Sequence, residues 1–254
     1  MPEQHPAPPP LAIARLGGAM YLIIILLGLF AELFVRQRLT ASNDVMVVAA
    51  NIREHELLWR SGVAAELLSL ICVTVLMLTW LAVLRPVSRD VAWLAIFFAL
   101  TAHAVGAMAS LQTLGTLFPL GGGRALASFT AEQVGALARL TQREREHTFG
   151  VSLLLSGCFF LVAGPMIYRS GYLPKVIGAL YTAAGVGYVA HTFTLVLVPA
   201  AANAVLTIAG PLILLGEGSL SLYLLIRGVN VDGWNRHQAS MSYRRDSLRV
   251  EPWE

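Results

Sequence analysis

Six ionisable side chains stand inside the long apolar segments of this 254-residue chain. Each segment carries one of them, and together they are Glu32, Glu66, His103, His147, His191 and Glu217. A charge at the centre of a bilayer costs about 2.5–3.5 kcal/mol on insertion scales, so ionisable residues in such segments usually serve a function. We therefore treat these six residues as a candidate intramembrane polar site.

Carboxylates and imidazoles in one site can support three kinds of chemistry. They can ligate iron, zinc or copper, and the candidate metal ligands here are His147, Glu217 and Glu32. They can relay protons, as in pumps and transporters, and paired histidines can hold a haem iron. Glu144 and His147 have the Glu-x-x-His spacing of di-iron bundles, although such a site needs two of these pairs. The residues alone leave the metal or cofactor undetermined.

Positions along the segments predict that all six groups can converge in the outer half of one helix bundle. Structural interpretations that need no ligand stay open. Glu32 can pair with Arg36 one helical turn away, and Glu66 can pair with Arg60 or Arg53. His103 and His191 can be neutral side chains that bond across helices. His147, at the end of a charged run, can simply be solvated.

Glu217 has the most unusual surroundings of the six. It lies between two glycines, Gly216 and Gly218, and it follows the pair Gly210-Pro211. Proline removes a helix hydrogen bond, and glycine weakens a helix locally. The pattern predicts a broken or kinked helix beside a buried carboxylate, which is how some transporters expose backbone to a ligand.

The composition indicates which elements position these groups. Hydrophobic residues make up 56% of the chain and charged residues 13%, where soluble domains carry roughly 25%. The mean hydropathy is +0.67. Backbone groups in hydrocarbon must be satisfied internally, and the apolar runs lack the alternation of barrel strands. The sequence therefore predicts an all-α fold, a polytopic membrane helix bundle.

The apolar runs predict six transmembrane helices, at about 16–35, 61–84, 91–117, 147–168, from the turn at 169–175 to 198, and 203–226. The connections 40–59 and 125–146 have amphipathic patterns. We interpret them as short interfacial helices after segments one and three, or as extensions of the neighbouring spans. The membrane domain then covers 13–229, between a disordered N-terminal tail at 1–12 and a polar C-terminal tail at 230–254.

The charges are scattered at the segment ends, although the net charge is +3. They are typical of membrane anchors, so we expect a lipid bilayer as partner and no nucleic acid. The counts of Lys and Arg favour the side of the N-terminus by a small margin. An even number of spans puts both termini on one side, which we expect to be the cytoplasm. Cys72 and Cys158 lie in apolar runs and are interpreted as small hydrophobic side chains.

Several short stretches carry a family resemblance. They read Ala-Arg-Leu-Gly-Gly at 14–18, Ala-Glu-Leu-Phe-Val-Arg at 31–36, Leu-Arg-Pro-Val-Ser-Arg at 84–89, Tyr-Arg-Ser-Gly-Tyr-Leu-Pro-Lys at 168–175, and Gly-Glu at 216–217 with Arg-Gly-Val at 227–229. Over about residues 12–230 the chain resembles a bacterial integral membrane family, domain of unknown function 4386. The resemblance implies an inner-membrane protein and carries no activity. It draws attention to Glu32, Arg36, Arg85, His147, Arg169 and Glu217.

Three functions remain in competition at this level. The one we favour is the handling of a small molecule or ion through the intramembrane polar site. The first alternative is a metal- or haem-binding enzyme or redox protein. The second is a structural or regulatory membrane protein in which the ionisable groups only pair helices. The sequence shows no phosphate loop, nucleotide fingerprint or nucleophile elbow, so whether the protein is an enzyme stays open.

Overall fold

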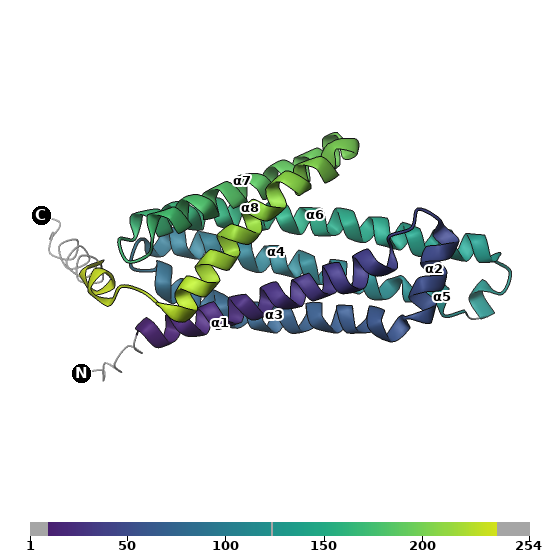
Figure 1. Cartoon of the computed structure of the whole chain (residues 1–254), viewed down its shortest axis with the longest axis horizontal. Helices are drawn as coiled ribbons and strands as arrows, with labels where there is room; N and C mark the ends of the chain where they lie inside the picture. Colours follow the sequence, from purple (N-terminus) through teal and green to yellow (C-terminus); the bar gives the residue numbers. More distant parts are fainter. Residues whose placement is uncertain (1–9, 123, 238–254) are drawn as a thin grey trace, which may run out of the picture.

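The computed structural model describes residues 10–122 and 124–237, and every regular element in those ranges is helical. Six helices are long and apolar enough to cross a membrane, which confirms the predicted polytopic bundle (Figure 1). The spanning elements are α1 (Pro10–Leu29) continued by the π-helix η1 (Phe30–Gln37), α3 (Glu56–Leu84), α4 (Arg89–Gly115), α6 (Ala131–Arg169), α7 (Lys175–Leu197) and α8 (Pro199–Ile226). The short helices are α2 (Val45–Glu54), α5 (Leu117–Leu120) and η2 (Arg124–Leu126).

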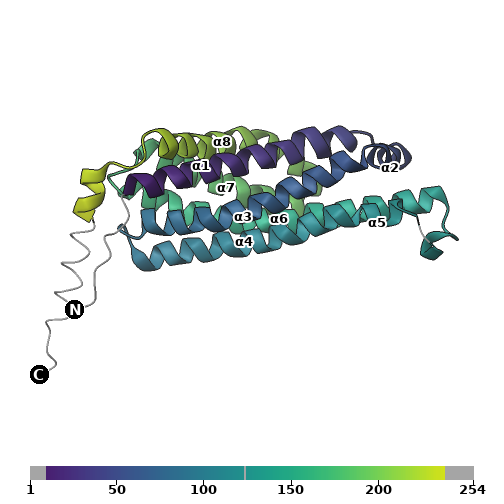
Figure 2. The same cartoon turned by 90° about the horizontal axis from the view of Figure 1, so that it is seen from below.

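The six long helices form a closed ring. In the order α1, α3, α4, α6, α7, α8 each packs against the next, and α8 returns to α1 (Figures 1 and 2). Every one of them contributes to a main core, which includes Tyr21, Trp80, Ile96, Phe160 and Leu220. Close approach depends on small residues: a Cβ at Gly18 of α1 would lie 2.4 Å from the backbone nitrogen of Leu225. Such contacts allow helices to associate where lipid supplies no hydrophobic driving force.

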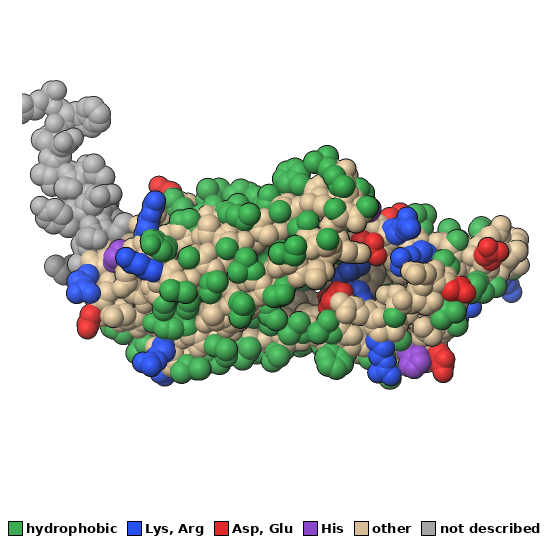
Figure 3. Space-filling view, turned by 45° about the horizontal axis from the view of Figure 1, so that its top comes forward, with side chains coloured by type: hydrophobic (Ala, Val, Ile, Leu, Met, Phe, Trp, Pro, Cys, Tyr) green, Lys and Arg blue, Asp and Glu red, His purple; other side chains and the backbone are tan. Residues whose placement is uncertain are grey.

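The outer surface of this ring suits lipid. Many large apolar side chains are exposed on it, among them Leu26, Ile71, Phe97, Val196 and Ile208. Figure 3 shows the central part of one face covered by hydrophobic and uncharged side chains, with Lys, Arg, Asp and Glu gathered toward its ends. The exposed surface and the six apolar helices together are consistent with a multi-pass membrane protein.

Helix α6 is much longer than a bilayer requires. Its 39 residues span about 58 Å at 1.5 Å per residue, against about 30 Å of hydrocarbon. The first part of α6 packs against α2 and α5. Together with η1 and the start of α3, these elements enclose a second apolar core, which we call the end lobe. Its buried members are Val35, Leu39, Val48, Ala49, Ile52, Trp59, Leu117, Leu120, Val134 and Ala138.

The predictions for the two amphipathic connections, 40–59 and 125–146, have different outcomes. The first contains a separate helix, α2, capped by Asp44, whose carboxylate accepts from the Met46 backbone N–H at 2.8 Å. Its placement at a membrane interface stays a prediction. The interpretation of 125–146 as a separate interfacial helix is wrong, and the alternative of an extension is correct. A capping box between Thr130 and Gln133 starts α6 there, and the helix continues unbroken to Arg169.

The turn from α6 to α7 is fixed by buried hydrogen bonds. Gly171 adopts φ +70°, and the Tyr172 hydroxyl donates to the Val83 carbonyl at 2.5 Å. Burial raises the pKa of Tyr172 well above its usual value, so this hydroxyl stays a donor. The Asn230 backbone N–H donates to the Tyr172 carbonyl at 3.1 Å, and residues 231–237 continue as a helix. This turn therefore has a structural role.

The predicted tails lie mainly outside the described residues. Residues 10–12, predicted as tail, form the first turn of α1, while residues 1–9 and 238–254 are not described. Trp234, predicted in the polar tail, is buried in the main core. The start of α1 and the end of α8 lie at the same end of the bundle, opposite α2 and α5 (Figure 1).

Candidate functional site

Arg36 is the centre of a charged cluster. Its Nε and Nη2 donate to Oε2 of Glu32 at 2.9 and 2.6 Å, and its Nη1 donates to Oε1 of Glu66. The same Glu66 oxygen lies 3.5 Å from Nη2 of Arg145. The side chains of Arg36, Glu66 and Arg145 are only 13%, 15% and 11% exposed. We call Glu32, Arg36, Glu66 and Arg145 the arginine–glutamate cluster.

Local backbone geometry brings α1 and α3 together at this cluster. Glu32 and Arg36 lie in η1, the π-helical continuation of α1, and π-turns occur frequently at functional sites. Val35 faces Gly62 of α3, where an added Cβ would lie 3.0 Å from the valine side chain. Because Gly62 has no side chain, η1 approaches α3 one turn before Glu66, and the Arg36 guanidinium reaches that carboxylate.

The cluster separates the two apolar cores. Along α3, Trp59 belongs to the end lobe and Val73 to the main core, and Glu66 lies between them. Along α6, Ala138 belongs to the end lobe and Phe159 to the main core, and Arg145 lies between them. Figure 3 shows a hollow near the border between the uncharged surface and the charged end, with basic side chains inside it and acidic side chains at its rim. The cluster is therefore a polar layer between two hydrophobic regions.

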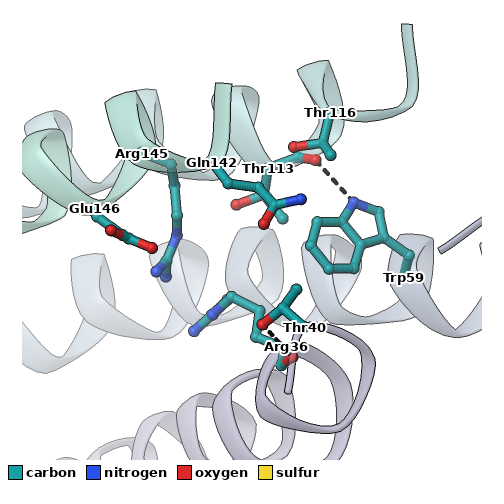
Figure 4. Close-up of a pocket in the computed structure, with 8 residues that line it drawn as sticks. All are labelled: Arg36, Thr40, Trp59, Thr113, Thr116, Gln142, Arg145 and Glu146. Atoms are coloured by element: carbon teal, nitrogen blue, oxygen red, sulfur yellow. Dashed lines mark hydrogen bonds between the residues drawn. The ribbon is translucent and has the colours of Figure 1, made fainter. Parts of the chain in front are cut away.

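A small cavity opens beside the cluster (Figure 4). The space open to the centres of water-sized molecules is about 40 Å³, room for roughly three waters. Side chains from η1, α3, α4 and α6 line it. They are those of Arg36, Thr40, Trp59, Thr113, Thr116, Gln142, Arg145 and Glu146.

Several buried polar atoms at the cavity and in the adjoining arginine–glutamate cluster are unsatisfied. Within the described part of the chain, Arg145 Nε, Gln142 Nε2 and Glu66 Oε2 are buried and have no hydrogen-bond partner. Leaving a buried donor or acceptor unpaired costs about 1–3 kcal/mol, so such groups are rare in folded proteins. The wall of the cavity thus offers hydrogen bonds to a molecule that enters it.

Glu217 lies in a second polar cluster, formed by α1, α7 and α8. The Tyr188 hydroxyl donates to Glu217 Oε1 at 2.6 Å, and the hydroxyls of Tyr21 and Tyr181 are 2.8 Å apart. We call these four residues the tyrosine–glutamate cluster. The prediction beside Glu217 was a broken or kinked helix; helix α8 runs from Pro199 to Ile226 through Pro211 without interruption, so the helix is not broken there.

The predicted convergence of all six ionisable groups is not observed. Glu32 and Glu66 meet at Arg36, whereas Glu217 belongs to the tyrosine–glutamate cluster. His147 is exposed on α6. Of the residues described, no group of three or more His, Cys, Asp or Glu side chains is placed to hold a metal ion. The three candidate metal ligands, Glu32, His147 and Glu217, are therefore distributed over separate surroundings.

The other two histidines bond to backbone. His103 Nδ1 lies 2.7 Å from the Ala99 carbonyl of its own helix. His191 is buried, and its Nδ1 lies 3.3 Å from the Ala202 carbonyl of α8, which links α7 to α8. This contact agrees with the structural interpretation of a histidine that bonds across helices.

The chain matches one family model, described as Domain of unknown function (DUF4386), over residues 16–228. The chain belongs to this family. No curated protein and no solved structure matches it. Both polar clusters lie inside the matched range. The predicted family resemblance is thus confirmed, and the family description assigns no activity.

The basic residues of the family motifs have different environments. Arg36 lies in the arginine–glutamate cluster, but Arg85 and Arg169 are exposed at the ends of α3 and α6. The alternative partners proposed for Glu66 are also wrong: Arg60 pairs with Glu56 at 2.7 Å, and Arg53 donates to a backbone carbonyl.

Arg145 and Gln142 are the residues that sequence reasoning missed. Both are buried, although Arg145 lies in the charged run Arg143–Glu146. The signal was helical spacing, because residues 134, 138, 142 and 145 follow one another at intervals of four, four and three on one buried face. Continuing α6 back to Ala131 would have placed Arg145 inward beside Glu66.

Proposed function

We propose that this DUF4386 protein binds and handles a small polar solute or ion at the cavity beside Arg36 and Arg145. The observation that carries the proposal is the set of buried, unsatisfied polar atoms on Arg145, Gln142 and Glu66. A cluster that only holds helices together would be expected to satisfy its buried groups internally. The cavity beside these atoms supplies the space for a partner.

The alternative functions have less support. A metal or haem site needs several suitable ligands together, and Glu32, His147 and Glu217 lie in different surroundings. A purely structural role accounts for Arg36, whose guanidinium is shared between Glu32 and Glu66. A purely structural role does not explain why Arg145 Nε is buried without a hydrogen-bond partner in the described structure.

The proposal includes a place in the cell. We propose a bacterial inner-membrane protein with both termini in the cytoplasm, as the small excess of Lys and Arg on that side favours. The cavity lies near the opposite end of the bundle, where η1 ends and the end lobe begins. A solute would then reach the site from the outer side of the membrane.

The test uses the full-length protein purified in detergent. Thermal unfolding is followed with acetate, inorganic phosphate, ammonium, glycine and glycerol, each titrated at constant ionic strength. A bound solute stabilises the folded state by RT ln(1 + [L]/Kd), so at least one should raise Tm saturably in the wild type.

Matched arginine variants locate the binding site. Arg145→Gln should abolish the Tm shift, whereas Arg143→Gln, an exposed position two residues away on α6, should leave it unchanged. No saturable shift with any of the five solutes, or a shift equal in both variants, would overturn the proposed function.

A further inference from the structure

The hydrogen-bonding inventory of the cavity wall restricts which ligand fits it. The hydroxyls of Thr40, Thr113 and Thr116 each donate to a backbone carbonyl, at 2.9, 3.0 and 3.3 Å. The Trp59 indole N–H donates to the Thr113 carbonyl at 2.8 Å. The protons of these four side chains are therefore already used, and the free donors come from other residues.

Gln142 presents its amide nitrogen as one free donor. Arg139 Nη1 donates to Gln142 Oε1 at 3.3 Å, and a guanidinium has no acceptor, so the amide oxygen must be the atom facing it. The amide nitrogen is left on the other side, unpartnered in the described structure. Gln142 is only 7% exposed and lines the cavity, as Figure 4 shows. A buried amide N–H that points into a cavity needs an acceptor there.

Arg145 presents the second free donor and the more weakly paired of the two guanidinium groups. Glu32 and Glu66 both contact Arg36 closely, whereas Arg145 lies 3.5 Å from one oxygen of Glu66 and over the ring of Phe149, 4.8 Å from its centroid. Its Nε has no partner in the part of the chain described. Glu146 also lines the cavity, but that residue is exposed to solvent. Arg145 is therefore the less closely paired of the two arginines at the cavity, and an anionic acceptor fits its free Nε–H.

We propose that the ligand of this cavity is a small monocarboxylate, and this inference rests on the proposed function. Its carboxylate oxygens accept from the Arg145 guanidinium and from the Gln142 amide nitrogen, which are three residues apart on one face of α6. The cavity holds roughly three waters, so the ligand has only a few heavy atoms.

The experiment is isothermal titration of the full-length protein in detergent at constant ionic strength. The titrants are acetate, propionate, inorganic phosphate, glycerol and ammonium. Acetate or propionate should bind saturably and more tightly than the other three. Arg145→Gln and Gln142→Glu should each weaken that binding by at least about tenfold, because each removes a charge-assisted hydrogen bond or adds a repelling carboxylate. Arg143→Gln should bind as the wild type does.

The outcomes separate the ligand class from the proposed function. If phosphate, glycerol or ammonium binds more tightly than both carboxylates and Arg145→Gln abolishes it, the carboxylate is wrong and the solute-binding function stands. If none of the titrants binds, or if Arg145→Gln and Gln142→Glu both leave acetate binding unchanged, both are overturned. Gln142→Glu keeps the test decisive should Arg145→Gln fail to fold, because its side chain has nearly the same shape.

Discussion

The two polar clusters hold a glutamate inside the bundle in different ways. In the arginine–glutamate cluster, Glu66 accepts a hydrogen bond from the guanidinium of Arg36, and the same carboxylate oxygen lies 3.5 Å from Arg145. In the tyrosine–glutamate cluster, Glu217 accepts a hydrogen bond from the Tyr188 hydroxyl. Among the described residues no Lys or Arg forms an ion pair with Glu217. One cluster balances charge with charge, and the other supplies only neutral hydroxyl groups.

Position in the fold explains this difference. The arginine–glutamate cluster lies between the main core and the end lobe beside the cavity of Figure 4, and Glu32 is 42% exposed, so solvent can reduce the cost of several charges. The tyrosine–glutamate cluster is surrounded by aromatic side chains of the main core. Phe160 stacks on Tyr181 with centroids 4.1 Å apart, and Tyr188 meets Phe160 edge-on. Equal substitutions in the two clusters should therefore have unequal effects.

The largest effect is expected for Glu66→Gln. The substitution removes the one carboxylate among the described residues that both Arg36 and Arg145 contact, and it leaves two buried guanidiniums beside each other. Breaking a buried ion pair by removing one partner costs about 3–5 kcal/mol, and the residual exposure of these side chains favours the lower figure, about 3 kcal/mol. Unfolding of the purified protein in detergent, by denaturant or heat, measures the loss.

Glu56→Gln is the matched control on the same helix. Glu56 pairs with Arg60 at 2.7 Å, but these side chains are 48% and 53% exposed. Exposed pairs contribute less than about 1 kcal/mol. If Glu56→Gln destabilises the protein as much as Glu66→Gln, the arginine–glutamate cluster has no special role in stability.

An intermediate effect is expected for Tyr188→Phe. This change removes the hydroxyl that donates to Glu217 and leaves a buried acceptor unpaired, at a cost of about 1–3 kcal/mol. Glu217→Gln should cost less than about 1 kcal/mol, because an amide oxygen still accepts the Tyr188 hydroxyl. The same unfolding assay compares them. A loss for Glu217→Gln as large as that for Glu66→Gln would show that both clusters hold their carboxylates as charges.

Of the two changes that remove a tyrosine hydroxyl, Tyr21→Phe is expected to have the smaller effect. This change removes the Tyr21 hydroxyl, so the 2.8 Å hydrogen bond between Tyr21 and Tyr181 is lost. The Tyr181 hydroxyl remains. A hydrogen bond between neutral groups contributes about 1 kcal/mol net. Binding titrations at the cavity should be unchanged in this variant. A change in acetate binding in Tyr21→Phe would mean that the two clusters are coupled.

Part of the candidate site could be predicted from local spacing. Glu32 and Arg36 are four residues apart, and their pair was expected on that ground alone. Of the break or kink predicted near Pro211, the break is absent, whereas a π-helical segment occurs in η1, which contains no proline or glycine. A π-turn depends on how the neighbouring helix packs, so the local sequence does not predict it.

The amino-acid sequence by itself determined the six spanning helices, because a chain with so few charges must satisfy its backbone inside helices to remain in lipid. Only the tertiary structure decided which polar groups meet. Arg36 reaches Glu66 thirty residues away, and Arg145 joins them from α6. Such contacts depend on how each helix is rotated about its axis and how closely it approaches its neighbours, and in apolar segments the composition of the faces constrains that rotation only weakly.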